Sequence, residues 1–367
     1  MEAVTYIPVD VVKHFMMDVF QSLGVPEADA RISTDVLITS DLRGIDSHGL
    51  GRLKYYYDRI RAGVHLVRTE IEIVQESETT VLVDGHHGMG HVIAHRSMRM
   101  AMDKARRHGL GAAAVRNSTH FGIAGYYPLM AAREGMIGLT VTNARPSIAP
   151  TFGTEPMLGT NPIAFAAPTD MPYPFCLDAA TSICQRGKIE IADRAEKAVP
   201  EGWVIDEQGN PLTDPTQILA GFDKAKAALL PLGGAGEEFA GYKGYGLATM
   251  VEILSAALAG GAFMKGLTGF AEDGSRRPFM VGHFFLAIDI AHFLPLEAFC
   301  RITGQMMRDL QGAGKAPGQE RIYVAGEKEY EMEQARREQG IPVNVNLKRE
   351  MQVMRDELHI EGYEAYF

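Results

Sequence analysis

Residues 80–94, TVLVDGHHGMGHVIA, decide the fold class, because an apolar run passes through glycines into a helical pattern. A Rossmann fold uses such glycines to bring backbone N–H groups to a pyrophosphate, and places an acid about 20 residues later. Here the spacing is Gly88-x-Gly90-x-x-x-Ala94, and the next expected strand ends at Val115-Arg116-Asn117 without an acid. Arg116 could instead serve a 2′-phosphate. We predict a plain strand–turn–helix rather than a Rossmann nucleotide site.

The same stretch begins a histidine series, His87, His91 and His95, spaced one helical turn apart. Two such histidines can clamp a metal ion. This series lacks the neighbouring carboxylate of an HExxH motif, so we predict one polar helix face and no metal site.

On either side of this stretch the pattern changes period. The first 65 residues favour helices, the middle favours short strands joined by turns, and the charged end after residue 327 favours helices interrupted at 340–342. A glycine cluster at 233–246 leads into a helix of small residues. The strands that we expect are 72–74, 79–85, 109–115, 137–142 and 162–166, with a hairpin at 203–211.

Composition limits the classes of partner. The 367 residues carry 36 Lys and Arg against 46 Asp and Glu, a formal net charge of −10, with no basic run. This balance argues against nucleic acid or an anionic membrane as the main partner, and the length suggests two domains or one large one. The segment 245–264 is long enough to span a bilayer, but it carries Glu252, so we expect a buried helix. Three scattered cysteines and no signal peptide favour reduced thiols and a cytoplasmic location.

The stretch from Asp41 to Tyr56 carries the first candidate chemistry. On a helix starting at about residue 48, His48, Arg52 and Tyr55 or Tyr56 share a face. An imidazole exchanges an alcohol proton near neutral pH, and a guanidinium fork holds a carboxylate, which is what a hydroxy-acid dehydrogenase needs. The alternative is a helix capped by Asp46 or Ser47 with charges facing solvent.

A second candidate, His120, follows a buried strand in Asn117-Ser118-Thr119-His120-Phe121-Gly122. Strand ends commonly carry site residues, but a hydrogen-bonded loop histidine explains this pattern equally well.

Both stretches resemble segments of the type 2 malate/L-lactate dehydrogenase family, which includes sulfolactate, ureidoglycolate and diketogulonate dehydrogenases or reductases. The similarity covers about residues 9–358. Further motifs follow in family order: Thr142-Asn143-Ala144-Arg145-Pro146, Leu158-Gly159-Thr160-Asn161-Pro162, Asp178-Ala179-Ala180-Thr181-Ser182, Gly187-Lys188 and Gly241-Tyr242-Lys243-Gly244-Tyr245-Gly246.

The resemblance implies an α/β fold of the α+β type. A non-Rossmann nicotinamide-binding domain with a mostly antiparallel sheet would be inserted in a helix-rich second domain. We expect residues 1–125 plus 311–367 to form the helix-rich domain that carries the catalytic residues, and residues 126–310 to bind NAD or NADP. The family also implies a homodimer.

By the same resemblance, His48 is the catalytic acid/base, Asp178 is the acid that supports it, and Arg52 grips the substrate carboxylate. Tyr56 and Ser47 would line that pocket. His120 is the proton acceptor in some members, so either histidine could move the proton. A paired carboxylate would stabilise the His48 imidazolium, which favours His48, with His120 donating to the carbonyl oxygen or orienting the substrate.

The resemblance places the cofactor on small residues and two lysines. Arg145 and Arg186 could favour a 2′-phosphate, so the choice between NAD and NADP stays open. The chain departs from the family pattern at Ala325, where many members carry Pro, which puts a cofactor contact there in question. The implied cofactor residues are Thr142, Asn143, Ala144, Thr160, Asn161, Pro162, Asp178, Ala180, Thr181, Ser182, Lys188, Lys243 and Gly244.

The sequence thus predicts an NAD(P)-dependent oxidoreductase that transfers hydride between a nicotinamide and C2 of a small 2-hydroxy or 2-oxo acid. Malate/oxaloacetate is the first expectation and L-lactate/pyruvate the second. The alternatives are a reductase of cyclic imino acids (piperideine- or pyrroline-2-carboxylate) or of other 2-oxo acids, and a ligand-binding homologue without turnover.

Overall fold

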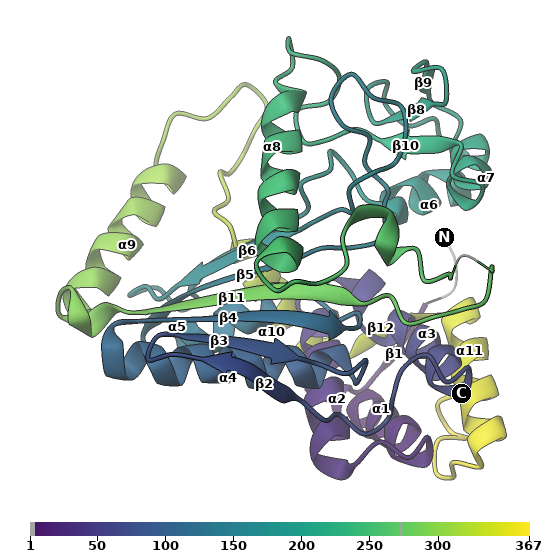
Figure 1. The fold of residues 1–367 in the computed structure, drawn as a ribbon, viewed down its shortest axis with the longest axis horizontal. Helices are drawn as coiled ribbons and strands as arrows, with labels where there is room; N and C mark the ends of the chain where they lie inside the picture. The colour runs from purple at the N-terminus through teal and green to yellow at the C-terminus, as the bar shows by residue number, and fades with distance from the viewer. Residues whose placement is uncertain (1–3, 272) are drawn as a thin grey trace.

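A seven-stranded sheet forms the centre of the computed structural model, which describes residues 4–271 and 273–367 (Figure 1). The strand order is β2-β3-β4-β11-β5-β6-β7, and among these described strands β3 and β4 alone pair in parallel. The mixed α/β class and the mostly antiparallel sheet are confirmed. The strands are β2 (Glu72–Glu76), β3 (Thr80–Asp84), β4 (Leu110–Ser118), β5 (Met136–Thr142), β6 (Ile163–Ala167), β7 (Phe175–Ala179) and β11 (Val281–Asp289).

Helices cover both faces of this sheet. The helices α4 (Gly90–His108) and α5 (Tyr126–Arg133) pack on one face, and α8 (Gly241–Glu252), with the π-helical turn η2 (Ile253–Ala257), lies on the other (Figure 1). Gly111 on β4 allows the close approach of α4, because a Cβ there would lie 2.0 Å from the Ala101 carbonyl oxygen. The strand–turn–helix predicted at 80–94 is confirmed as β3 followed by α4.

A second core joins the two ends of the chain. It packs α1 (Val9–Ser22), α2 (Glu27–Leu42) and α3 (Leu50–Arg61) against α11 (Val345–Leu358). In α1 the buried residues recur at helical spacing, which explains why this segment is an amphipathic helix; they are Val12, Phe15, Met16, Val19 and Phe20. The strands β1 (Val4–Ile7) and β12 (Ile341–Asn344) pair antiparallel beside this core.

A third core lies beyond the sheet, around a small sheet of order β10-β8-β9. The predicted hairpin at 203–211 is confirmed as strands β8 and β9 of this small sheet. The remaining elements are β8 (Val204–Asp206), β9 (Pro211–Leu212), β10 (Ala227–Leu229), α6 (Arg186–Arg194), α7 (Pro215–Asp223), η3 (Met264–Leu267), η4 (Ile290–His292), α9 (Leu296–Gln311) and α10 (Glu327–Gln339).

One local prediction is confirmed and another is wrong. The predicted interruption of the C-terminal helices lies between α10 and α11, where β12 pairs with β1 from the other end of the chain. The histidines 87, 91 and 95 do not form one polar face, since His87 precedes α4 and His91 is fully buried against the Tyr56 ring. Periodicity alone could not show that α3 covers this side of α4.

The small-residue segment after the glycine cluster is helical in α8 and η2, but the expectation that it is buried is wrong, because Leu247, Met250, Ile253 and Leu258 are exposed. No described helix is long and apolar enough to cross a bilayer. The acid of this segment, Glu252, is buried and accepts hydrogen bonds from the Met264 N–H at 2.7 Å and from Asn161 Nδ2 at 2.9 Å. Asn143 Nδ2 lies 3.5 Å away. One carboxylate therefore holds three chain segments together.

Replacing Glu252 by Ala should lower the free energy of unfolding by about 2–4 kcal/mol, because buried amide and N–H groups would lose their acceptor. Urea unfolding of the variant measures this change. The matched control is Glu201→Ala at an exposed position, which should stay within about 0.5 kcal/mol of the parent. Equal stability of the two variants would contradict the role given to Glu252.

Candidate active site

Asp41, at the end of α2, holds the turn that carries His48 in place. The Leu50 N–H at the start of α3 donates to Asp41 Oδ2 at 2.7 Å. A Cβ on Gly49 would lie 2.0 Å from Asp41 Oδ1, so glycine is required between the histidine and the helix. This cap fixes the direction in which α3 leaves the turn η1 (Asp46–His48).

A residue from the far end of the chain secures the same turn. Arg336 on α10 is buried, forms an ion pair with the Asp46 carboxylate and donates to the Asp41 carbonyl oxygen. Sequence analysis missed Arg336 and the capping role of Asp41. Nothing in the local pattern could indicate a contact across 290 positions.

The two candidate histidines meet in space. The His48 and His120 rings stack with centroids 5.6 Å apart and planes 26° apart. Tyr56 connects α3 to the loop that carries His120, because its hydroxyl lies 2.5 Å from His120 Nδ1. The structure therefore brings together His48, Tyr56 and His120, as the sequence predicted for a common site.

The partners of His120 indicate its tautomer. The Gly122 N–H donates to Nδ1 at 3.3 Å, so Nδ1 acts as an acceptor and the Tyr56 hydroxyl also donates to it. We assign the ring hydrogen to Nε2 on this basis. Burial and nearby His48 and Arg52 hold the pKa of His120 well below its usual range. His120 therefore presents a neutral N–H donor.

His48 has a hydroxyl partner rather than an acid. Ser47 Oγ lies 2.8 Å from His48 Nδ1, which leaves Nε2 for another partner. Burial and the Arg52 charge lower the pKa of His48 to about 4. Arg52 Nε donates to the Ser47 carbonyl at 3.1 Å, and no carboxylate of the described chain pairs with this guanidinium. Its terminal nitrogens can receive an anion.

Asp178 differs from the expectation that it supports His48. Its carboxylate accepts from the Gly125 N–H at 2.7 Å, on the loop that carries His120, and no hydrogen bond to His48 occurs within residues 4–271 and 273–367. Its side chain is accessible beside a cavity of about 40 Å³ that Arg43 and Glu329 also line.

Two further histidines surround Tyr56, and sequence analysis assigned neither to this site. The His91 ring centroid lies 4.6 Å from that of Tyr56, and the His65 ring centroid lies 6.0 Å away. Both are buried, and burial lowers the pKa of each to about 3. The floor of the site is thus built from neutral imidazoles.

Most of the predicted cofactor residues meet where three turns converge beside the sheet. Asn161 Oδ1 accepts from the Ala144 N–H at 3.2 Å, and Thr181 Oγ1 donates to the Thr160 carbonyl at 3.1 Å. The side chains of five of these residues are buried and hydrogen-bonded inside the protein, so they shape the turns. These five are Thr142, Asn143, Asn161, Thr181 and Ser182.

The other predicted cofactor residues leave surface available to a ligand. Ala144, Thr160, Pro162, Asp178 and Ala180 are partly or fully accessible. Lys188 on α6 and Lys243 in the first turn of α8 are exposed, and no carboxylate of the described residues pairs with either. Gly244 packs against the backbone, since a Cβ there would lie 2.2 Å from the Leu232 carbonyl oxygen.

Comparison with known proteins agrees with this geometry. The family model for malate/L-lactate dehydrogenase matches residues 7–352. The chain is 45% identical to a malate dehydrogenase of Pyrococcus horikoshii over 97% of this chain and 96% of that protein. It is 38% identical to an L-sulfolactate dehydrogenase of Methanocaldococcus jannaschii over 96% of this chain and 97% of that protein.

Among solved structures, a malate dehydrogenase from Entamoeba histolytica superposes with a TM-score of 0.95 at 42% identity, covering 98% of this chain and 99% of that one. The resemblance drawn from the sequence is confirmed. The chain belongs to the malate/L-lactate dehydrogenase family.

Proposed function

We propose that this chain is a malate dehydrogenase that uses NAD or NADP, with L-lactate as a poorer substrate. The observation that carries this proposal is the stacked pair of His48 and His120 beside the unpaired Arg52, in a chain 45% identical to a malate dehydrogenase. The broader prediction, an NAD(P)-dependent dehydrogenase of 2-hydroxy acids, agrees with the names of its relatives, which include NAD- and NADP-dependent enzymes. Steady-state kinetics with a panel of 2-hydroxy acids and with each nicotinamide tests the proposal that malate is the preferred substrate.

Arg52 would hold the C1 carboxylate with its free terminal nitrogens, because a planar fork matches the two carboxylate oxygens. His120 would donate its Nε2 hydrogen to the oxygen on C2. His48, whose Nδ1 is engaged by Ser47, would take the hydroxyl proton at Nε2 during oxidation and return it during reduction. Asp178 and Tyr56 would position His120 rather than touch the substrate.

The accessible residues around the three turns fit a dinucleotide. Lys188 and Lys243 are unpaired cations, and Lys243 lies in the first turn of α8, where backbone N–H groups also favour phosphate. Two of the turn residues, Ala144 and Ala180, have small side chains, which leave room for a ligand beside the sheet. When bound, the nicotinamide supplies the acceptor for the hydride that leaves C2.

Replacing His48 by Asn should lower kcat for malate oxidation by about 10²–10⁴-fold, because the proton acceptor is lost. Replacing His120 by Asn should lower it by about 10²–10³-fold through loss of a hydrogen bond to the reacting oxygen. Nicotinamide absorbance measures both. Near-normal turnover of the His48 variant, with an inactive His120 variant, would exchange the two roles.

The pH profile tests the charge environment of His48. A base works only when neutral, and the lowered pKa keeps His48 neutral until the pH falls towards about 4. The acid limb of kcat/KM, corrected for the ionisation of malate, should lie well below pH 6.5. Arg52→Gln removes one cause of the lowered pKa and should move the limb to higher pH. Arg52→Lys keeps the charge and should leave the limb in place, whereas a shift shared by both variants would contradict this account.

We also propose the domain division 1–125 plus 311–367 and 126–310, a homodimer and a cytoplasmic location. The core shared by both chain ends supports the joining of residues 311–367 to the first helices, whereas the seven-stranded sheet crosses the boundary at residue 125, because β4 pairs with β11. The absence of disulfides among the described cysteines supports the cytoplasmic location. For the dimer, α9, at the left edge of Figure 1, carries the exposed apolar residues Ile302, Met306 and Leu310, whose four-residue spacing puts them on one face.

Met306→Glu should halve the mass measured by light scattering, because a charge on this apolar face disfavours association. Ile191→Glu changes a residue of equal exposure, 60%, on α6 and should leave the mass unchanged. A Met306 variant with twice the mass of one chain would place the interface elsewhere.

A further inference from the structure

Helix α3 carries a second guanidinium beside the site. Arg59 follows Arg52 by seven residues, two helical turns, so both project from one face about 10 Å apart along the axis. Their Cζ atoms lie 5.5 Å (Arg52) and 5.6 Å (Arg59) from the centroid of the Tyr55 ring. The Tyr55 ring is itself 5.9 Å from that of His120. Two cations thus bracket the ring that borders the catalytic histidines.

No acid neutralises Arg59 within the described part of the chain. Its Nε donates to His65 Nε2 at 3.1 Å, and its Nη2 is buried without a hydrogen-bond partner. By contrast, Arg61 on the other side of α3 pairs with Glu357. Burial, with the charge of Arg276, lowers the pKa of Arg59. Holding a partly buried cation without a counterion costs free energy, which binding an anion would recover.

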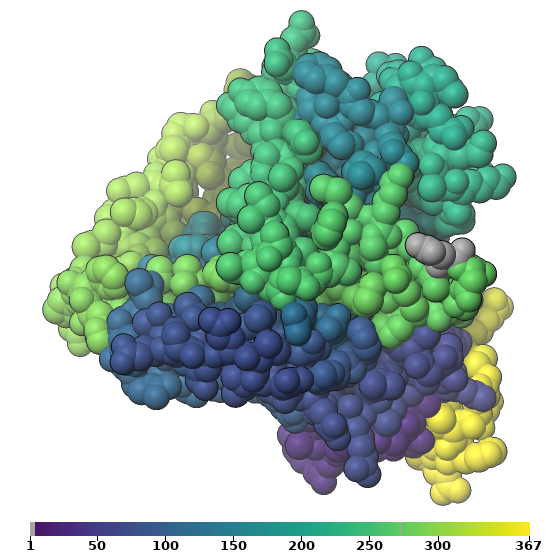
Figure 2. Space-filling model, in the orientation of Figure 1, coloured from purple at the N-terminus to yellow at the C-terminus, as the bar shows by residue number. Residues whose placement is uncertain are grey.

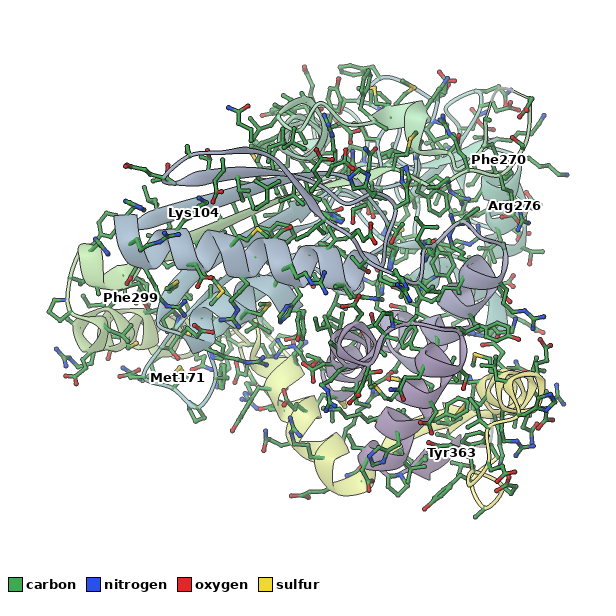
Figure 3. The ribbon with its side chains drawn as sticks, turned by 60° about the horizontal axis from the view of Figure 1, so that its bottom comes forward. Lys104, Met171, Phe270, Arg276, Phe299 and Tyr363 are labelled. Atoms are coloured by element: carbon green, nitrogen blue, oxygen red, sulfur yellow. The ribbon has the colours of Figure 1, made fainter. Side chains whose placement is uncertain are left out.

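The Arg59 side chain is held in position before any anion binds. Its Cζ lies 4.0 Å from the centroid of Phe279, on the segment between η3 and β11. Figure 3 labels Phe270 and Arg276, which bridge the two arms of this segment, and Figure 2 shows the segment in green against the blue-purple surface of the first helices. Contact with both rings and the hydrogen bond from Nε to His65 leave the terminal nitrogens of this guanidinium to receive an anion.

The charge around Tyr55 is positive throughout. Burial raises the pKa of Tyr55, and Arg59, Arg52 and Arg145 act against that rise. One carboxylate on Arg52 would leave the remaining cations uncompensated. A substrate with a second acidic group would compensate them.

We propose that Arg59 binds the distal acidic group, carboxylate or sulfonate, of a 2-hydroxy acid whose C1 carboxylate lies on Arg52. This inference rests on the proposed function and deepens it. It makes Arg59 the residue that separates dianionic substrates from L-lactate, which has a methyl group at that end.

The test compares three substrates, L-malate, 3-sulfolactate and L-lactate, in the parent enzyme and three variants. Arg59→Gln should lower kcat/KM for a dianionic substrate by about 10- to 100-fold, as expected for a lost charge-assisted contact, and change that for L-lactate by less than about twofold. Arg59→Lys keeps the charge, so its kcat/KM for a dianionic substrate should lie between the values of the parent enzyme and of Arg59→Gln. Arg61→Gln removes the same charge from the other side of α3 and should leave all three values unchanged.

A selective loss with malate or with sulfolactate supports the proposal and identifies which acidic group Arg59 binds. Equal losses with all three substrates would overturn it and assign Arg59 to packing against Phe279. Where L-lactate turns over too slowly, its inhibition constant against malate gives the same comparison. A parent enzyme that oxidises none of the three refutes the proposed function itself, which is a separate outcome.

Discussion

The hydrogen bond between Tyr56 and His120 is the contact on which the site depends. It joins helix α3 to the loop after β4, and it brings His120 to stacking distance from His48. The same bond makes Nδ1 an acceptor and so leaves the hydrogen on Nε2. One contact therefore determines both where His120 lies and what it can donate.

The rest of the site serves to keep those two imidazoles neutral and oriented. Arg336 and Asp41 hold the turn of His48, and Asp178 holds the loop of His120 through the Gly125 N–H. Burial makes imidazolium costly, so the positive charge of the site comes from guanidinium groups, which stay protonated. The site therefore sets fixed positive charge beside neutral imidazoles, which is what the proposed anionic substrate requires.

On the far side of the sheet, a single buried acid plays the corresponding role. Glu252 binds Asn161, Asn143 and the backbone at Met264, and the predicted cofactor turns converge around these side chains. Sequence analysis assigned these asparagines to the cofactor by resemblance. The structure shows that their amide groups are already engaged inside the protein, whereas Lys188, Lys243 and the small residues are accessible.

The sequence by itself determined most element types and the rejection of a Rossmann strand–turn–helix at 80–94, and it indicated His48, Arg52 and His120 as candidate site residues, because these follow from local periodicity, spacing and motifs. Tertiary structure decided which groups meet: Tyr56 with His120, Arg336 with Asp46, β1 with β12, and Asp178 with Gly125 rather than His48. Tertiary structure also places no carboxylate of the described residues beside Arg59. Such contacts join residues tens to hundreds of positions apart, and local pattern carries no information about which distant surface will cover a side chain.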